Sequence, residues 1–444
     1  MSVTVPAPGA ASLRSKKKSL LASTVGNVLE WYEWSAYAVF APFIAVVMFD
    51  QGDPLSALLS TLAVFAVGFL MRPLGGIVFG RIADRRGRKF VLVTTMLMMA
   101  AGSLVIGLMP TYAAIGAWAS VVLLSARVLQ GFAHGGESAT AYSYVGEIAP
   151  PHRRGMWGSV AFIAIFGGSV LAYTLGGALT SALPEPAVAE WGWRVPFLLG
   201  ALLALVALYL RRDMDESDVF EADRAREGGD APAPGSPPDP AAPAAPRMSR
   251  AGVVRAVLVM IAMVSGITAA HYTWTSYVST YAITQQGMDP GTAYWMSVAA
   301  QVVALVSLPF WGLLSDRIGR RPMLVFFAVL MFALQYPLTR MITDEGWTLL
   351  VATSLALLVV SAPAAILSAI LSESFPTRVR TQGIGFAYSL SVAVFGGTAP
   401  YLNQLFGNLG AEWVFGAYIM ALCALTGLSC LFIRETRGMV LAGE

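Results

Sequence analysis

Charged side chains are scarce in this chain of 444 residues, and their scarcity decides its class. They make up 12% of the residues, whereas hydrophobic residues make up 56% and the mean hydropathy is +0.65. A soluble domain carries about 25% charged residues, so composition excludes an ordinary soluble protein and makes the lipid bilayer the expected solvent. The net charge of +3 does not predict a nucleic-acid partner.

Groups that carry catalysis or bind metals are also few. The chain has three histidines and two cysteines, and Cys423 and Cys430 lie seven residues apart in the last apolar run. This spacing predicts packing residues, not a disulfide framework or a metal site. The sequence contains neither a Walker-type phosphate loop nor a nucleophile elbow. We therefore expect no enzyme, no metal and no cofactor, with any work driven by a gradient.

Long apolar runs dominate what remains. Runs of about 20 residues or more predict membrane-spanning helices, because backbone groups in hydrocarbon must bond within a helix or a closed barrel. The alternation typical of a barrel strand is absent. The twelve predicted spans are 20–48, 56–80, 90–109, 114–148, 156–180, 194–211, 252–284, 292–314, 322–341, 347–373, 381–407 and 413–433.

The basic residues predict the orientation of these spans. All but four of the 29 Lys and Arg residues fall on one side of the twelve-span arrangement. By the positive-inside rule that side faces the cytoplasm, together with both termini. The exceptions are Arg72, Arg127, Arg194 and Arg340. Arg194 and Arg340 fall at outer span ends, where snorkelling explains them, whereas Arg72 and Arg127 lie inside spans.

One decapeptide occurs twice and indicates an internal duplication. It reads Gly80-Arg-Ile-Ala-Asp-Arg-Arg-Gly-Arg-Lys89 in the first half and Gly312-Leu-Leu-Ser-Asp-Arg-Ile-Gly-Arg-Arg321 in the second. Parallel repeats of this kind imply a central cavity and rocking of one half against the other. The predicted divisions are a cytoplasmic tail at 1–19, a six-helix bundle at 20–212, a Pro/Ala-rich cytoplasmic linker at 213–249, a second six-helix bundle at 250–434 and a cytoplasmic tail at 435–444.

The repeated motif predicts a gate at the cytoplasmic end. Its glycines allow a tight turn, its aspartate can accept hydrogen bonds from the first N–H groups of a helix, and its arginines can pair with a glutamate. The predicted gate residues are Gly80, Asp84, Arg85, Gly87, Arg88 and Glu147, and in the second half Asp316, Arg317, Gly319, Arg320 and Glu373. In the first half the aspartate is expected to meet the start of the eleventh span. The alternative is a basic loop that only sets topology.

The first span carries two acids, which we expect to couple protons. Glu30, Glu33 and Tyr37 lie on one helical stripe, and neighbouring carboxylates repel each other, which favours binding of a proton. The halves align at an offset of 240 residues, so Ala270 and Thr273 stand where Glu30 and Glu33 would be, and only the first half has the acids. The alternative is a structural ion pair with Arg72 or Arg127.

The fourth span carries a second polar stripe. Arg127, Gln130, His134 and Glu137 follow each other at spacings of three, four and three residues, which places them on one face. Arg127 can hold Glu30 or Glu137 ionised until a substrate carboxylate competes, so Arg127 and Glu137 join Glu30 and Glu33 as predicted proton-coupling residues. For His134 the alternative to proton transfer is a hydrogen-bonded packing residue.

Arg72 is the predicted contact for an anionic substrate, because a guanidinium binds a carboxylate through two hydrogen bonds. Its alternative is an internal pair with Glu30 or Glu33. A dicarboxylate needs a second cation, Arg127 or Arg194, although Arg194 fits a structural role equally well. The other predicted substrate contacts are Tyr37, Gln130, Tyr277 and Tyr281. An interfacial aromatic belt is the alternative for the tyrosines of the seventh span and is favoured for Trp274.

These motifs together resemble the major facilitator superfamily, whose loop signature is the repeated decapeptide. Gly26-Asn-Val-Leu-Glu-Trp-Tyr-Glu33, Phe69-Leu-Met-Arg-Pro-Leu-Gly-Gly76, Arg127-Val-Leu-Gln-Gly-Phe-Ala-His-Gly-Gly-Glu137 and Trp191-Gly-Trp-Arg-Val-Pro-Phe197 resemble its metabolite:H+ symporter family. Gly68-Phe-Leu-Met-Arg-Pro73, Arg211-Arg-Asp-Met-Asp-Glu-Ser217, Tyr272-Thr-Trp-Thr-Ser-Tyr277 and Phe395-Gly-Gly397 resemble its α-ketoglutarate permeases. Glu33 departs from the pattern, because relatives usually carry Asp there.

The resemblance implies an all-α protein of twelve transmembrane helices in two pseudo-symmetric bundles. It further implies a secondary active transporter of the inner membrane that carries α-ketoglutarate or a related dicarboxylate together with protons. Proline/betaine and shikimate symporters share most of the motifs and give the alternative substrates. A proton-driven drug exporter is the alternative of another class. The expected partners are a small organic anion, protons and the lipid bilayer, with the chain as a monomer.

Overall fold

The fold of this protein, taken from a computed structural model, is helical throughout the part that is described. The described residues are 26–50, 52–86, 88–135, 145, 149–211, 250–374 and 380–439. No strand occurs among them, and each of the twelve predicted spans contains a helix. Eight helices of this described part are long and apolar enough to cross a membrane. The all-α, multi-pass prediction is confirmed.

The first half begins with helical residues 26–39, which a break at Phe40 separates from α2. Pro42 at the start of α2 explains this break, because it lacks an N–H group for the helical ladder. Pro73 similarly interrupts the second span at Met71. The elements of this half are α2 (Ala41–Met48), α3 (Pro54–Leu70), α4 (Arg72–Arg86), α5 (Arg88–Leu108), α6 (Tyr112–Ile115), α7 (Trp118–His134), η1 (Pro151–Arg153), α9 (Arg154–Ala182), α10 (Glu185–Glu190), η2 (Gly192–Arg194) and α11 (Val195–Arg211).

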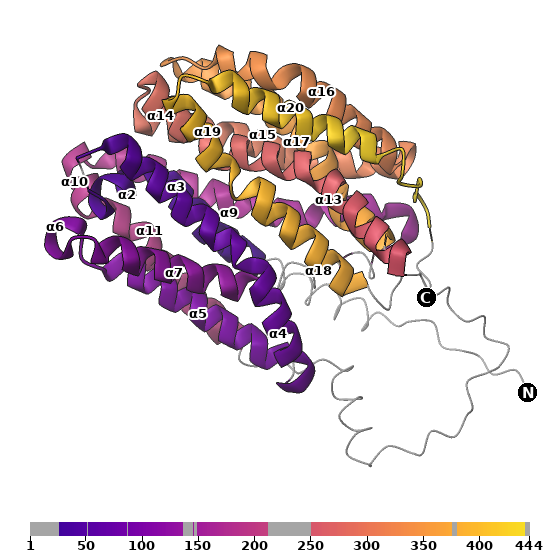
Figure 1. The fold of residues 1–444 in the computed structure, drawn as a ribbon, viewed down its shortest axis with the longest axis horizontal. Coiled ribbons are helices and arrows are strands. Elements are labelled where there is room, and N and C mark those ends of the chain that lie inside the picture. The colour runs from indigo at the N-terminus through magenta and orange to yellow at the C-terminus, as the bar shows by residue number, and fades with distance from the viewer. Residues whose placement is uncertain are drawn as a thin grey trace, which may run out of the picture.

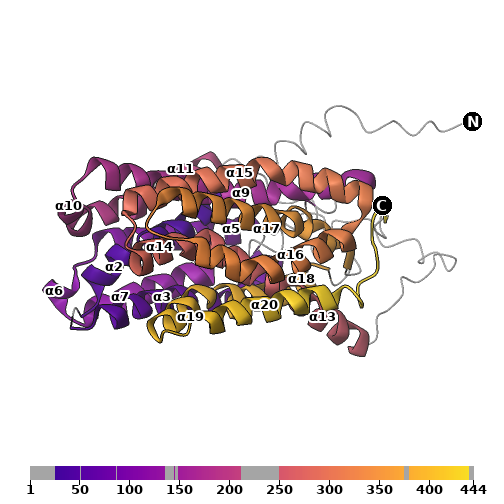
Figure 2. The same ribbon diagram turned by 90° about the horizontal axis from the view of Figure 1, so that it is seen from above.

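The second half repeats this plan with two π-helical turns, η3 and η5. Its elements are α13 (Arg250–Tyr272), η3 (Thr273–Tyr277), α14 (Val278–Gln286), α15 (Pro290–Ile318), α16 (Arg320–Met341), α17 (Gly346–Ser374), α18 (Arg380–Ser391), η5 (Val392–Gly396), α19 (Ala399–Asn408) and α20 (Glu412–Ser429). Figures 1 and 2 show the long helices lying roughly along one axis, with the first half in indigo to magenta beside the second in orange to yellow.

The two halves meet along α9, which packs against α15 and α17. The end of the molecule where α9 begins is called the basic end below. There α9 and α15 are so close that a Cβ added to Gly312 would lie 2.7 Å from the carbonyl oxygen of Gly155. At the opposite end, Tyr294 Oη donates to the carbonyl oxygen of Val39 at 2.6 Å. The halves therefore contact each other at both ends in this conformation.

Within the first half, α7 approaches the second span at backbone contact. A Cβ added to Gly131 would lie 1.9 Å from the carbonyl oxygen of Gly68, and one added to Gly135 would lie 2.0 Å from that of Arg72. Only glycine allows this approach. It brings the polar stripe of α7 next to the side chains of helical residues 26–39.

Candidate functional site

The two polar stripes predicted from the sequence face each other in the structure. Helical residues 26–39 and α7 pair their side chains in antiparallel order. Glu30 meets His134, Glu33 meets Gln130, and Tyr37 meets Arg127. All six side chains are buried, with Glu30 the most exposed at 8%. Glu137, the fourth member of the α7 stripe, lies outside the described residues.

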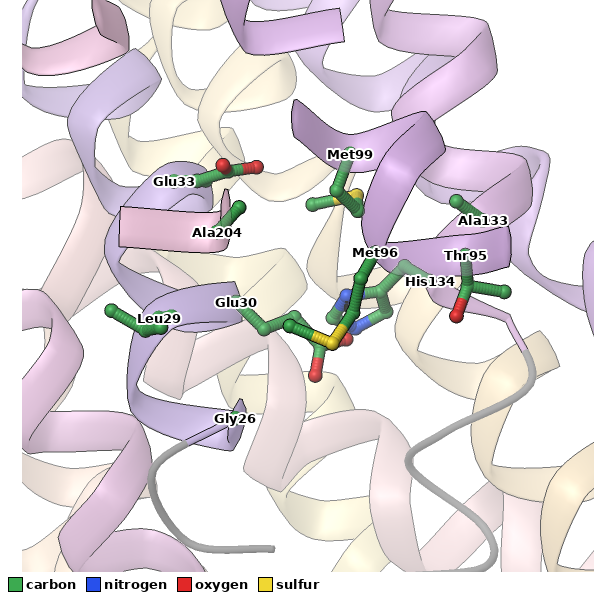
Figure 3. Close-up of a pocket in the computed structure, with 10 residues that line it drawn as sticks. All are labelled: Gly26, Leu29, Glu30, Glu33, Thr95, Met96, Met99, Ala133, His134 and Ala204. Atoms are coloured by element: carbon green, nitrogen blue, oxygen red, sulfur yellow. Dashed lines mark ion pairs between the residues drawn. The ribbon is translucent and has the colours of Figure 1, made fainter. Parts of the chain in front are cut away.

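A carboxyl oxygen of Glu30 contacts Nδ1 of His134, and Figure 3 shows the two side chains meeting. Both atoms are acceptors when the carboxylate is ionised and Nδ1 carries no hydrogen, so the contact is favourable only when one of the two groups holds a proton. Trp34 Nε1 donates a hydrogen bond to Nδ1 at 3.2 Å, which leaves the carboxyl group as the place for that proton. The pair is thus a place where one proton can reside inside the bundle.

Gln130 connects Glu33 to Arg127. Nη1 of Arg127 donates to Oε1 of Gln130 at 2.8 Å, while Nε2 of Gln130 lies 3.5 Å from Glu33 Oε2 and 2.9 Å from Ser103 Oγ. The amide therefore lies between the carboxyl group of Glu33 and the guanidinium of Arg127. This placement favours a positioning role for Gln130 over the direct substrate contact predicted from the sequence.

Both intramembrane arginines stack on Trp34. Cζ of Arg72 lies 4.3 Å, and Cζ of Arg127 4.2 Å, from the centre of its ring. Arg72 also lies 3.8 Å from the ring of Phe69, and Arg127 lies 4.2 Å from the ring of Tyr37. Cation–π contacts of this kind partly replace the lost hydration of a buried guanidinium.

A cavity of about 40 Å³ opens beside these groups, enough for water molecules at a polar site. It is lined by Gly26, Leu29, Glu30, Glu33, Thr95, Met96, Met99, Ala133, His134 and Ala204 (Figure 3). All of its lining residues belong to the first half. Both acids thus face a chamber inside one bundle, separate from the interface between the halves.

The remaining predicted substrate contacts are dispersed. The Tyr37 hydroxyl donates to the carbonyl oxygen of Thr61 at 3.0 Å. Tyr277 donates to Gln404 at 2.7 Å, and Tyr281 accepts a hydrogen bond from Gln286. The structure therefore gives each of these hydroxyls an internal partner.

Arg194 and Trp274 both depart from simple expectations for membrane-interface residues. Nη1 of Arg194 donates to the carbonyl oxygens of Gly107 and Met109, which favours the structural role that its sequence position left open. Trp274 is 1% exposed and donates to Gln335, so it does not belong to an interfacial belt. Trp274 instead repeats the internal role that Trp34 has in the first half.

The second copy of the decapeptide joins the halves at the basic end. Asp316 accepts hydrogen bonds from the backbone N–H groups of Gly155 and Met156, at 2.8 and 3.0 Å. These groups begin α9, where the helix dipole favours an anion. Arg320 bonds Asp316 at 2.7 Å and approaches Glu373 at 3.4 Å.

Two further members of this cluster had no signal in the decapeptide. Arg154 of the first half pairs with Glu373 at 3.0 Å, so the glutamate binds cations from both halves. Glu435 accepts hydrogen bonds from the N–H groups of Arg320 and Arg321, at 2.9 and 3.0 Å. Arg154 lies just before the fifth predicted span and Glu435 just after the last one. Their contacts join segments that are far apart in the chain.

The pKa of Glu435 reflects this position. Burial alone raises the pKa, but the backbone N–H groups of Arg320, Arg321, Arg437 and Thr436 outweigh it and bring the pKa below its usual range. A lowered folded-state pKa means that the contribution to stability is complete above the unfolded-state pKa. It is lost as the pH falls through the lowered value. The contact is therefore intact at neutral pH.

The first copy of the motif is only partly visible. Gly80 is exposed, with nothing within 4 Å of an added Cβ. Gly87 and Glu147 lie outside the described residues, as do the side chains of Asp84, Arg85 and Arg88. In the second copy, Arg317 is exposed and Gly319 has a positive φ of 105°, as a turn between α15 and α16 requires.

Closure of the basic end depends on Gly312, and Gly312→Ala is expected to disfavour it. The new methyl group would lie 2.7 Å from the Gly155 carbonyl oxygen and 2.8 Å from Met156 Cα, so α9 and α15 must separate. Overpacking costs about 1–3 kcal/mol, which predicts at least a several-fold shift toward separated helices. Electron–electron distances between spin labels placed at the exposed residues His152 and Ile318 measure the shift.

Gly167→Ala is the matched control on α9, because its added Cβ would meet nothing closer than 4.0 Å. It should leave the distance distribution unchanged. An unchanged distribution in Gly312→Ala would show that the basic end closes without this contact.

Comparison with known proteins adds three findings. The model of the family described as "Sugar (and other) transporter" matches residues 18–233 and 235–443. The chain is 35% identical to the α-ketoglutarate permease of Escherichia coli K12, over 95% of this chain and 94% of that protein. It is 36% identical to the ectoine/proline transporter ProP of Corynebacterium glutamicum, over 96% of this chain and 86% of that protein.

Solved structures share the fold. The crystal structure of a D-xylose-proton symporter superposes with a TM-score of 0.69 at 19% identity, covering 95% of this chain and 99% of that one. A partially occluded, inward-open structure of the xylose transporter XylE from E. coli gives a TM-score of 0.70 at 17% identity, covering 93% of this chain and 97% of that one. At such identity the likeness concerns the fold alone.

Proposed function

The chain belongs to the sugar (and other) transporter family of the major facilitator superfamily, and on this premise we propose that it is a proton-coupled symporter of a small carboxylate. It is a multi-pass membrane transporter and not an enzyme. The proposed substrate is α-ketoglutarate or a related dicarboxylate, carried across the inner membrane by alternating access. The proposed driving force is the proton gradient, with no cofactor.

The observation that carries proton coupling is the pairing of the two polar stripes. Glu30 and Glu33 line one cavity, and each faces a polar group, His134 for Glu30 and Gln130 with Arg127 for Glu33. We assign proton binding to these acids. Loss of a proton from Glu33 strengthens its attraction to Arg127 through Gln130, which rearranges the guanidinium that stacks on Trp34.

Substrate binding is proposed at Arg72. Its guanidinium shares Trp34 with Arg127, so a carboxylate that binds Arg72 changes the field at Arg127 and hence the proton affinity of Glu33. Mutual changes of affinity of this kind are the thermodynamic basis of coupling. We propose the cluster of Arg154, Asp316, Arg320 and Glu373 as the cytoplasmic gate that opens when the halves rock.

The orientation and division of the chain belong to the same proposal. We place the basic end, both termini and linker 213–249 in the cytoplasm, because all but four of the 29 Lys and Arg residues fall on that side. The two six-helix bundles, 20–212 and 250–434, are the rocking units.

A zwitterion such as proline or betaine is the second candidate substrate. The relatedness to the ectoine/proline transporter favours it, and buried aromatic rings such as those of Trp31 and Tyr272 can hold a quaternary ammonium group. Arg72 would then bind the single carboxylate.

Counterflow into proteoliposomes tests the proposal. Labelled α-ketoglutarate, shikimate and betaine are offered with and without an inward pH gradient. We expect α-ketoglutarate to accumulate, and to accumulate further when the gradient is imposed. If only betaine accumulates, the proposed substrate is wrong and betaine takes its place. If accumulation is the same with and without the pH gradient, the proposal of proton symport is wrong.

A further inference from the structure

A second, smaller cavity lies between the two halves. Its volume is about 10 Å³, room for about one water molecule, so a metabolite can enter only when the halves separate. It is lined by Trp31, Ser35, Ile165, Phe166 and Ser169 of the first half and by His271, Thr275 and Ser276 of the second. It thus lies on the surfaces that alternate access would expose.

His271 occupies this cavity in a fixed orientation. Its ring packs edge-on against Trp31, Phe162 and Phe166 of the first half and against Tyr272 of its own half, at centroid distances of 6.2, 6.1, 5.4 and 5.3 Å. The imidazole of the second half therefore inserts into an aromatic frame that belongs mostly to the first. Rocking of the halves must expose it.

Two polar atoms of the cavity are buried without a hydrogen-bond partner within the described part of the chain. They are Nδ1 of His271 and Oγ of Ser169. An unsatisfied buried polar group costs about 1–3 kcal/mol, so each of these atoms gains from a polar partner. Because both atoms lie on one cavity between the halves, they can offer two hydrogen bonds to a single polar ligand.

The backbone beside His271 is irregular, and the polar groups of Thr275 have partners of their own. α13 ends at Tyr272, and the π turn η3 follows directly. The Thr275 hydroxyl donates to the carbonyl oxygen of His271 at 2.6 Å, and the Tyr173 hydroxyl donates to the carbonyl oxygen of Thr275. Single π turns are frequent at functional sites because they redirect side chains.

Trp31 connects this cavity to the proposed anion site. Its ring lies 5.9 Å from Cζ of Arg72 and 6.2 Å from the ring of His271. The cation Arg72 thus lies on one side of Trp31, and the imidazole of His271 and the hydroxyl of Ser169 lie in the cavity that Trp31 lines. Each of these two uncharged groups can donate one hydrogen bond. This arrangement fits a ligand with an anionic group at both ends better than a ligand with one.

We propose that His271 Nδ1 and Ser169 Oγ form a subsite for the distal carboxylate of a small dicarboxylate whose other carboxylate binds Arg72. The subsite rests on the proposed function and deepens it, because it distinguishes dicarboxylates from monocarboxylates. The C-terminal half thereby contributes to substrate selection, while the proton-binding acids stay in the N-terminal half.

His271→Phe tests the subsite, because phenylalanine keeps a ring in the aromatic frame and removes only the nitrogens. Counterflow compares α-ketoglutarate with 2-oxopentanoate, which has the same chain length but lacks the distal carboxylate. The variant is expected to raise the KM for α-ketoglutarate about tenfold or more and to leave that for 2-oxopentanoate within about twofold, consistent with a polar contact worth about 1.5–3 kcal/mol.

Conservative variants separate recognition from packing. The amide of Asn can place a nitrogen near the position of Nδ1, so His271→Asn should restore part of the preference, and Ser169→Ala should lose a smaller part. His152→Phe, at an exposed histidine, is the matched control and should behave as the unmodified protein.

The outcomes are distinct. If His271→Phe keeps the preference for the dicarboxylate, or if both substrates weaken equally in His271→Phe and His271→Asn, the subsite is overturned. If the unmodified protein carries neither oxo acid, the proposed function fails before the subsite is reached.

Discussion

Glu33→Gln is expected to abolish accumulation driven by a pH gradient while substrate exchange continues. Glutamine preserves the shape of the side chain and can still bond Gln130 and Ser103, but it cannot bind and release a proton. Glu33 is 5% exposed and lines the cavity, where Glu30 is the other acid. The accumulation ratio should therefore fall to about one, the value without coupling.

The measurement is uptake of labelled α-ketoglutarate into proteoliposomes, with an imposed gradient for accumulation and without one for counterflow. Glu190→Gln, at an exposed glutamate of α10, is the control and should accumulate normally. If Glu33→Gln still accumulates substrate, the Glu30–His134 pair carries the proton, and Glu30→Gln must then show the loss.

Arg72→Gln is expected to reduce carboxylate transport by about tenfold to a hundredfold, with or without a gradient. The substitution removes the positive charge and the bidentate geometry at 3.8 Å from the ring of Phe69 and 4.3 Å from that of Trp34. A hydrogen bond to a charged group contributes about 1.5–3 kcal/mol, which corresponds to that range. Arg72→Lys should recover only part of the loss, because an ammonium lacks the planar fork.

Counterflow at several substrate concentrations distinguishes a raised KM from a lowered maximal rate. Arg340→Gln is the control, since the Arg340 side chain is 64% exposed and lies 3.9 Å from Glu412. Undiminished α-ketoglutarate counterflow in Arg72→Gln would show that Arg72 is not the anion site.

Helical periodicity predicted each polar stripe separately. Spacings of three and four residues place Glu30, Glu33 and Tyr37 on one face, and the same rule applies to Arg127, Gln130 and His134. Periodicity is a property of one helix, so it does not specify which stripe faces which. Gly68 and Gly131 allow α3 and α7 to approach each other closely, and this contact appears only in the tertiary structure.

The gate residues likewise divide into contacts that the sequence motif predicts and contacts that it does not. By symmetry with the first copy, the decapeptide predicted that Asp316 would act as a helix cap and that Arg317 or Arg320 would pair with Glu373. It carried no information on Arg154, 219 residues from Glu373, or on Glu435, 115 residues from Arg320. These partners come from the opposite half and from the segment after the last span.

By itself the sequence determined the membrane class, the twelve spans, the duplication and the residues whose charges must be explained inside a bilayer. These follow from hydropathy, charge distribution and helical period, which are all local properties of a chain in hydrocarbon. Only the tertiary structure decided that the two acids share a chamber within one bundle and that His271 enters the aromatic frame of the other half. Such contacts depend on how close helices approach and how they are rotated, which packing of distant side chains sets and no local pattern encodes.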